Sequence, residues 1–166
     1  MKKSVALRYL PKKLSEKDNK KQFKELSKSR RLYKKGKYYT RRKLDTFVSK
    51  KSHHITNAER MYHVDKITAN PELANATGCS VSALKKIVNK GEGAYFSSGS
   101  RPNQSAQSWG YARLASAITS GKAAAIDYNI LEKGCRPGSK ALRLAKQARK
   151  KHGYGTRRVP KAVIDI

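Results

Sequence analysis

Apolar residues recur at helical spacing, three or four positions apart, in most segments of this chain that carry them. Each such segment has a Ser or Asn that can cap the first turn, and most have a Gly that can stop the last turn. We therefore predict a mainly α fold with a few short strands. The expected helices lie at about residues 15–36, 52–62, 70–77, 80–90, 103–121 and 139–151.

Two other stretches have a less definite pattern. Residues 122–130, KAAAIDYNI, fit either a strand or a short helix capped at Asp127. The last residues, 156–166, end in Val163, Ile164 and Ile166, which predict a strand or an apolar hook. A hook of this kind would latch onto a neighbouring subunit by strand addition.

The stretch from Gly91 to Gly121 is the part of the chain best suited to form a core. It contains only two cations, Arg101 and Arg113, and it holds the only Trp, Trp109. A core forms where charges are few, because an ionised side chain is costly to remove from water unless it is paired. Within this stretch, residues 95–102 predict a short strand that leads into a structured loop, and the helix that follows carries Trp109 into the core.

Positive charge is concentrated at the two ends of the chain. Residues 1–66 hold 22 Lys and Arg against 6 Asp and Glu, residues 136–166 hold 10 against 1, and residues 67–135 hold 7 against 4. We therefore predict an extended basic helical N-terminal arm (1–66), a small central helical domain (67–135) and a basic C-terminal helix and tail (136–166). The formal net charge of +28 makes such a chain repel itself, which favours binding to a polyanion such as DNA, RNA or an anionic membrane surface.

Residues 70–90 resemble the helix-turn-helix of DNA-binding proteins. Asn70 caps a brief first helix, Gly78 supplies the turn, and Ser80 can cap the second helix. The residues predicted to form the buried seam are Leu73, Val81, Leu84 and Ile87. The residues predicted to face the major groove or its phosphates are Ser80, Ser82, Lys85, Lys86 and Asn89. A helical hairpin that only packs fits the same pattern.

Two further segments could contact an anion. Residues 37–51, KYYTRRKLDTFVSKK, interleave aromatics with cations such as Arg41 and Arg42, which suits phosphate contact and base stacking. The same aromatics could instead pin an irregular arm to the core. Residues 97–105, SSGSRPNQS, place hydroxyls, backbone N–H groups and Arg101 ahead of a helix, which suits a phosphate or carboxylate. Such a loop can equally satisfy its own polar groups and cap the helix.

The sequence lacks the patterns of the common catalytic and metal sites. Gly121-Lys122 has neither the earlier Gly nor the following Ser or Thr of a P-loop, and the eleven carboxylates form no convincing acid–base pair. Cys79 and Cys135 stand in no zinc spacing, and reduced cysteines are expected. We predict a non-enzymatic protein without cofactor or metal. A signal peptide and a membrane span are not expected either, so the protein is expected not to be secreted.

The segment GAYFSSGSRPNQSAQSWGYARLASAI, residues 93–118, is distinctive. It resembles an uncharacterised family of basic proteins in nucleo-cytoplasmic large DNA viruses, including algal viruses and mimivirus relatives. Three other segments support the resemblance: YLPKKLS at Tyr9, SRRLYKKGKYY at Ser29 and LANATGCSVSALKKIVNKG at Leu73. The resemblance covers most of the chain, and it implies a family without an established activity, so no catalytic residue is carried over.

What the resemblance implies is a context, a DNA virus and the cell that it infects. The expected function is that of a structural protein of the virion, a minor capsid or inner-layer protein that bridges capsid proteins and the polyanion inside the shell, either DNA or an anionic membrane. The expected partners are these capsid proteins and this polyanion, with no small-molecule substrate. The expected location is the virion and the cytoplasm or nucleus of the infected cell. The alternative is a helix-turn-helix DNA-binding protein with a regulatory or genome-packaging role.

Overall fold

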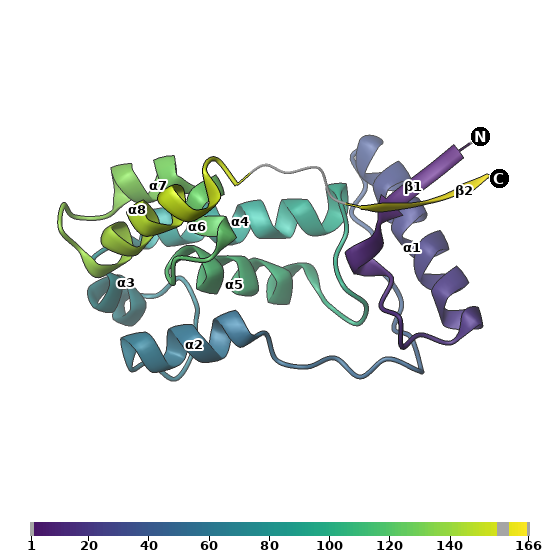
Figure 1. Cartoon of the computed structure of the whole chain (residues 1–166), viewed down its shortest axis with the longest axis horizontal. Helices are drawn as coiled ribbons and strands as arrows, with labels where there is room; N and C mark the ends of the chain where they lie inside the picture. Colours follow the sequence, from purple (N-terminus) through teal and green to yellow (C-terminus); the bar gives the residue numbers. More distant parts are fainter. Residues whose placement is uncertain (1, 156–159, 166) are drawn as a thin grey trace. The chain divides into compact units, whose positions relative to one another are not determined.

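The computed structural model describes residues 2–155 and 160–165 and confirms a mainly α fold (Figure 1). The chain divides into two compact units. Among the described residues, unit 1 contains 2–50, 92–106 and 160–165, and unit 2 contains 51–91 and 107–155. The boundaries predicted from charge, after residues 66 and 135, both fall inside unit 2. Charge counts missed the division because each unit is built from segments that are distant in the sequence.

Unit 1 contains one small sheet and one long helix. Its elements are β1 (Lys2–Ala6), the short 3-10 helix η1 (Leu7–Tyr9), α1 (Glu16–Lys34), the last turns of α4 (Val81–Ser97) and β2 (Lys161–Asp165). β1 and β2 pair antiparallel, with Ser4 opposite Val163 (Figure 1). The predicted C-terminal strand therefore exists. It pairs with the first strand of its own chain, which supplies the backbone N–H and C=O groups that a neighbouring subunit was expected to supply. The rest of the predicted tail, residues 156–159 and 166, lies outside the described residues.

Unit 1 has an apolar core of its own. Its buried apolar side chains are Val5, Tyr9, Leu10, Phe23, Leu26, Leu44 and Tyr95. Phe23 and Leu26 belong to the stripe predicted for α1, and this helix begins as expected, with the Ser15 hydroxyl accepting a hydrogen bond from the backbone N–H of Asp18 at 3.1 Å. The segment predicted as an extended arm is therefore folded, because its few apolar residues come from different elements and bury one another.

The irregular segment 35–50 is tied to α1 by a carboxylate. Asp18, which is buried, accepts hydrogen bonds from the hydroxyl of Thr46 at 2.5 Å and from its backbone N–H at 2.8 Å. These bonds favour the ionised carboxylate and hold the pKa of Asp18 below its ordinary value of 3.8. The segment is thus anchored to unit 1 through Thr46.

Unit 2 is a bundle of short helices. Its elements are α2 (His53–Tyr62), α3 (Pro71–Thr77), the first turns of α4, most of α5 (Ala106–Ala117), α6 (Lys122–Ile126), α7 (Tyr128–Gly134) and α8 (Lys140–His152). Residues 122–130 are helical, so of the two options for this segment the strand was wrong. The alanines Ala123, Ala124 and Ala125 are buried, and a helix lets three consecutive small residues pack against different neighbours.

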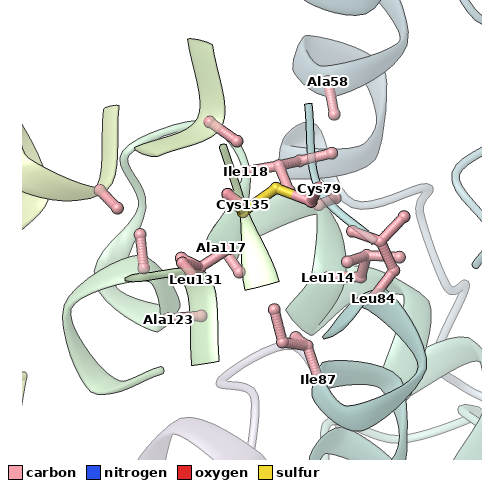
Figure 2. Packing of buried hydrophobic residues seen from close by; sticks show 14 of the residues in the cluster. Ala58, Cys79, Leu84, Ile87, Leu114, Ala117, Ile118, Ala123, Leu131 and Cys135 are labelled. Carbon is pink, nitrogen blue, oxygen red and sulfur yellow. A yellow bond between two sulfur atoms is a disulfide. The ribbon is translucent and has the colours of Figure 1, made fainter. Parts of the chain in front are cut away.

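A disulfide lies inside the core of unit 2. Figure 2 shows the Cys79–Cys135 bond among apolar side chains that include Leu84, Leu114 and Ile118. Both cysteines are buried, and they are 56 residues apart in the sequence. The expectation of reduced cysteines was therefore wrong, since only the packing of α3, α4 and α7 brings the two sulfur atoms together.

The strand predicted near residue 95 is the end of a helix. α4 continues to Ser97, and Leu84, Val88, Gly91 and Tyr95 follow one another along it at intervals of four, three and four residues. All four are buried. The buried positions therefore keep helical spacing through the glycines. The many small residues in this stretch made the helix hard to predict from the sequence.

Trp109 is only partly buried, although we predicted it in the core. On α5 the neighbouring Gly110 lies against α4, where a Cβ added at Gly91 would come within 2.6 Å of the Gly110 Cα. The two helices thus meet through glycines, and further along α5 the core is filled by Leu114 and Ala115. Trp109 is one residue before Gly110, so its side chain is rotated by about 100° around α5 and lies beside the contact between the two helices.

Candidate nucleic-acid interface

The hairpin formed by α3 and α4 has the local geometry that the sequence predicts. The Asn70 side chain accepts a hydrogen bond from the backbone N–H of Leu73 at 2.8 Å and caps α3. Gly78 ends this helix with a φ of 81°, in the left-handed region that favours glycine. The Ser80 hydroxyl then accepts from the backbone N–H of Ala83 at 3.1 Å. The turn between the two helices is therefore short and capped on both sides.

The two sides of the first half of α4 differ in burial. Leu84 and Ile87 are fully buried, as predicted, and so is Leu73 of α3. The exposed residues on the other side follow at spacings of three, one and three positions and form one stripe, here called the α4 face: Ser82, Lys85, Lys86 and Asn89. The α4 face therefore presents two cations and two hydrogen-bonding side chains to the solvent.

Ser80, predicted to contact DNA, uses its polar groups within the fold. Its hydroxyl caps α4, and its backbone N–H donates a hydrogen bond to the carbonyl of Gly134 at 2.8 Å. Ser80 is exposed, but these two bonds give it a structural role at the start of the helix. We therefore leave it out of the α4 face.

The segment that joins α7 to α8 holds the turn of the hairpin in place. The backbone N–H of Arg136 donates to the carbonyl of Gly78 at 2.9 Å, and Gly134 packs so closely on Ala83 that a side chain would not fit between them. The disulfide lies between these contacts and links the turn covalently to the end of α7. Two cations within two residues of Cys135, Lys133 and Arg136, are exposed.

Helix α8 gives unit 2 a second basic surface. Its first turn is capped by the Ser139 hydroxyl, which accepts from the backbone N–H of Leu142 at 3.4 Å. Its buried side is made of small and apolar residues: Ala141, Leu142, Ala145 and Ala148. Exposed cations lie on its remaining sides: Lys140, Arg143, Lys146, Lys150 and Lys151. The basic C-terminal helix predicted from the sequence is thus packed on a core and keeps its charge in the solvent.

Arg41, predicted to contact nucleic acid, is buried in unit 1 with 8% of its surface exposed. Its guanidinium donates hydrogen bonds to the Ser29 hydroxyl at 2.9 Å, the Tyr95 carbonyl at 2.7 Å and the Ser100 hydroxyl at 2.7 Å. It also lies 3.8 Å from the centre of the Tyr95 ring. Burial lowers the pKa of Arg41, and within the described part of the chain no carboxylate forms a salt bridge with it. Its donors are occupied by these neutral acceptors, so the structure gives Arg41 a structural role.

The SSGSRPNQS loop is held by hydrogen bonds to unit 1. Asn103, with a φ of 61°, accepts from the backbone N–H of Leu44 at 2.7 Å and donates to the carbonyl of Phe47 at 2.7 Å. The Ser100 hydroxyl, which accepts from the buried guanidinium, donates to the carbonyl of Arg101 at 2.8 Å. These bonds favour the alternative in which the loop satisfies its own polar groups.

The other two predicted arginine contacts keep exposed side chains. Arg101 lies on the surface of the loop, and the backbone N–H of Arg42 donates to a carboxylate oxygen of Glu25 at 3.2 Å. Both arginines belong to unit 1, whereas the α4 face belongs to unit 2. Within unit 2, the structure places four residues of the predicted set, those of the α4 face, on one surface.

Replacing Arg41 with Met is expected to destabilise the protein by roughly 2–3 kcal/mol, because the two hydroxyls and the carbonyl that accept from it would remain buried without a donor. Urea unfolding followed by circular dichroism measures this loss. Arg42→Met is the matched control, since this exposed neighbour should change the free energy of unfolding by less than about 0.5 kcal/mol. Equal stability of the two variants would contradict the structural role.

The pattern of residues along the chain does not predict that Lys133 and Arg136 lie near the hairpin. They lie 36 and 39 positions after the end of α4, around a break rich in Gly and Pro that predicts only a loop. The one signal that could have placed them was the pair of cysteines, because a bond between Cys79 and Cys135 brings this segment to the turn.

A protein-family model described as a family of unknown function (DUF5824) matches residues 7–134. No curated protein matches the chain, and no solved structure matches it. Among the residues that the structure describes, no group of three or more His, Cys, Asp or Glu side chains could hold a metal ion. None of the described helices has the length and hydropathy needed to cross a membrane.

Proposed function

Because the chain belongs to the DUF5824 family, whose function is unknown, we propose a function from its own surface: it is a non-enzymatic protein that binds double-stranded DNA through the α4 face, as a structural component of a virus particle. The observation that carries the binding is the exposed stripe of Ser82, Lys85, Lys86 and Asn89 on the second helix of a tight hairpin. The second helix of such a hairpin is the one that enters the major groove in helix-turn-helix proteins.

The chemistry of the α4 face suits both parts of a DNA duplex. Lys85 and Lys86 can pair with phosphates, and the exposed Arg136, whose backbone N–H bonds to Gly78, adds positive charge near the hairpin. Asn89 has the amide that pairs with the edge of adenine in the major groove. The disulfide and the hydrogen bond to Gly78 hold the turn before any contact with DNA, so little ordering of the backbone is needed on binding.

The charge of unit 2 supports binding that depends mainly on phosphates. Its described residues include 16 Lys and Arg against 5 Asp and Glu. Two of the five acids are already neutralised within the unit: Asp127 by Arg113 and Lys90, and Glu59 by Lys51. Affinity for DNA should therefore fall steeply with salt, since each phosphate contact releases counterions and adds about −0.9 to the slope of log K against log salt.

Replacing Lys85 and Lys86 with Ala is expected to lower the salt slope for a 20-base-pair duplex by about 2 and to weaken binding at low salt by tenfold or more, about 1.4 kcal/mol. Fluorescence anisotropy over a range of salt concentrations measures both quantities. The matched control is Lys12→Ala with Lys13→Ala, which removes the same charge from another exposed pair. If both double variants bind the duplex equally well, the α4 face is not the interface.

A regulatory helix-turn-helix role is the second candidate, and the stripe that places Ser82 and Asn89 beside the two lysines favours it. A regulator should prefer one duplex sequence in the presence of excess random DNA, and Asn89→Ala should reduce this preference while leaving the salt slope unchanged. A structural or packaging component should bind duplexes of different sequence with similar affinity. Competition experiments with random DNA therefore separate the two candidates.

The virion assignment is supported by the resemblance of residues 93–118 to basic proteins of large DNA viruses and by the strongly basic surface. A structural component should be present in purified particles at tens to thousands of copies, together with capsid proteins. Quantitative mass spectrometry of purified particles measures this abundance. Absence from the particles, with the protein present in infected cells, would reject the structural role and leave the DNA-binding proposal standing.

A further inference from the structure

Unit 1 carries a cluster of aromatic side chains on its surface. The cluster consists of Tyr33 at the end of α1, Tyr38 just after it and Phe96 in the last turn of α4. The centre of the Tyr38 ring lies 5.1 Å from that of Phe96 and 6.2 Å from that of Tyr33. Tyr38 is 74% exposed and Tyr33 is 37% exposed. We call these three residues the aromatic cluster.

The aromatic cluster is held by a buried ring and by the turn that ends α1. Phe96 meets the ring of Tyr95 edge-on, with the centres 5.0 Å apart, and Tyr95 is fully buried. On the other side, Gly36 has a φ of 74° and ends α1, and the backbone N–H of Lys37 donates to the carbonyl of Leu32 at 2.9 Å. Tyr38 therefore stands on a fixed turn, and its ring is positioned although most of its surface meets water.

The surroundings of the cluster are positively charged. The exposed cations adjacent to its tyrosines in the chain are Arg31, Lys34, Lys35 and Lys37. The acid closest to it along α4 is Glu92, one turn before Phe96, and its side chain is partly buried. Exposed aromatic rings, tilted by 50° to one another and flanked by cations, fit a ligand that has both aromatic faces and negative charge.

We infer that the aromatic cluster is a stacking site for unpaired bases of single-stranded nucleic acid, with the phosphates contacted by Lys34, Lys35 and Lys37. Bases inside a duplex already stack on each other, so their faces are closed to a tyrosine ring, whereas unpaired bases are free to stack on it. This site goes beyond the duplex-binding α4 face, uses different residues and does not depend on it. The cluster contains aromatic rings and no aliphatic side chain, which favours stacking over insertion into a membrane.

The test uses the full-length protein and a fluorescein-labelled 20-nucleotide oligothymidylate, whose bases form no duplex. Tyr38→Ala is expected to weaken binding about five- to a hundredfold, the range for loss of one stacked base. The salt slope should stay unchanged because no phosphate contact is lost, and Tyr38→Trp should restore or strengthen binding. The matched control is Tyr154→Ala, which removes another tyrosine with 74% exposure and should bind as the natural protein does.

Two comparisons separate this site from the duplex site. Tyr38→Ala should leave affinity for a 20-base-pair duplex unchanged, and Lys85→Ala with Lys86→Ala should leave affinity for the oligothymidylate within about twofold. Unchanged oligothymidylate binding by Tyr38→Ala would overturn the inference, and so would an equal loss for single strand and duplex. Binding of phosphatidylserine vesicles that depends on Tyr38, without any such dependence for the oligonucleotide, would assign the cluster to a membrane instead. The proposal for the α4 face is tested separately, by the effect of the Lys85 and Lys86 replacements on duplex binding, so failure of the stacking site alone leaves it standing.

Discussion

Replacing Asp127 with Asn is expected to destabilise the protein by about 3–5 kcal/mol. The Asp127 side chain is completely buried, and its two oxygens accept from Arg113 at 2.8 and 2.9 Å and from Lys90 at 2.6 Å. Asparagine has nearly the same shape but carries no charge, and its amide group would donate toward a cation. Arg113, with 19% of its side chain exposed, would remain largely out of water without a partner, next to a second cation.

Urea unfolding of the Asp127→Asn variant measures this loss, with Asp65→Asn as the control. Asp65 is exposed and lies in the same unit, so its replacement should change stability by less than about 0.5 kcal/mol. Adding Arg113→Met to an Asp127→Leu variant should recover part of the loss, because an apolar pair can replace a buried ion pair at little cost. A loss of less than about 1 kcal/mol for Asp127→Asn would show that the ion pair contributes little.

Removal of the disulfide is expected to lower the free energy of unfolding by about 4 kcal/mol. The bond joins residues 56 positions apart, and most of its effect comes from the loop that it closes in the unfolded chain. Replacing Cys79 and Cys135 with Ala leaves only small side chains at two buried positions, so the change reports chiefly on the lost link. Because the bond also holds the turn of the hairpin, the double variant should bind duplex DNA more weakly at the temperature where it begins to unfold.

Two measurements check the disulfide. Unfolding in urea should occur at lower concentration after reduction with dithiothreitol, and the double alanine variant should unfold at the same concentration with or without it. Alkylation of the natural protein in denaturant without reductant, followed by mass spectrometry, should label neither cysteine. Two labelled cysteines together with unfolding that is insensitive to reductant would show that the bond is not formed.

The helix starts of this protein were predictable because capping is local. Ser15, Asn70, Ser80 and Ser139 each accept a hydrogen bond from a backbone N–H three residues ahead, so the signal and the structure lie within one turn. The exposed and buried sides of α4 were equally predictable, since the spacing of Leu84 and Ile87 defines one side and leaves Lys85 and Asn89 on the other. The α4 face is therefore a property of the sequence itself.

Arg41 shows what such reasoning misses. In the sequence it is one cation among many in a basic segment, and nothing nearby distinguishes it from Arg42. Its burial depends on Ser29, Tyr95 and Ser100, which come from α1, α4 and the following loop. The ring of Tyr38 likewise contacts Phe96, which is 58 positions away in the chain. The composition of this segment suggested both stacking and anchoring, but it did not show that Arg41 is buried and Tyr38 is exposed.

The sequence by itself determined the starts of most helices, their caps, the tight hairpin of α3 and α4 and the excess of positive charge, because each depends on residues within a few turns of one another or on composition alone. Only the tertiary structure decided which basic residues face water, which cysteines meet and which strand pairs with β2. Most of those outcomes depend on contacts between residues fifty or more positions apart. The pattern of polar and apolar residues along a chain says which side of an element is buried but not what buries it.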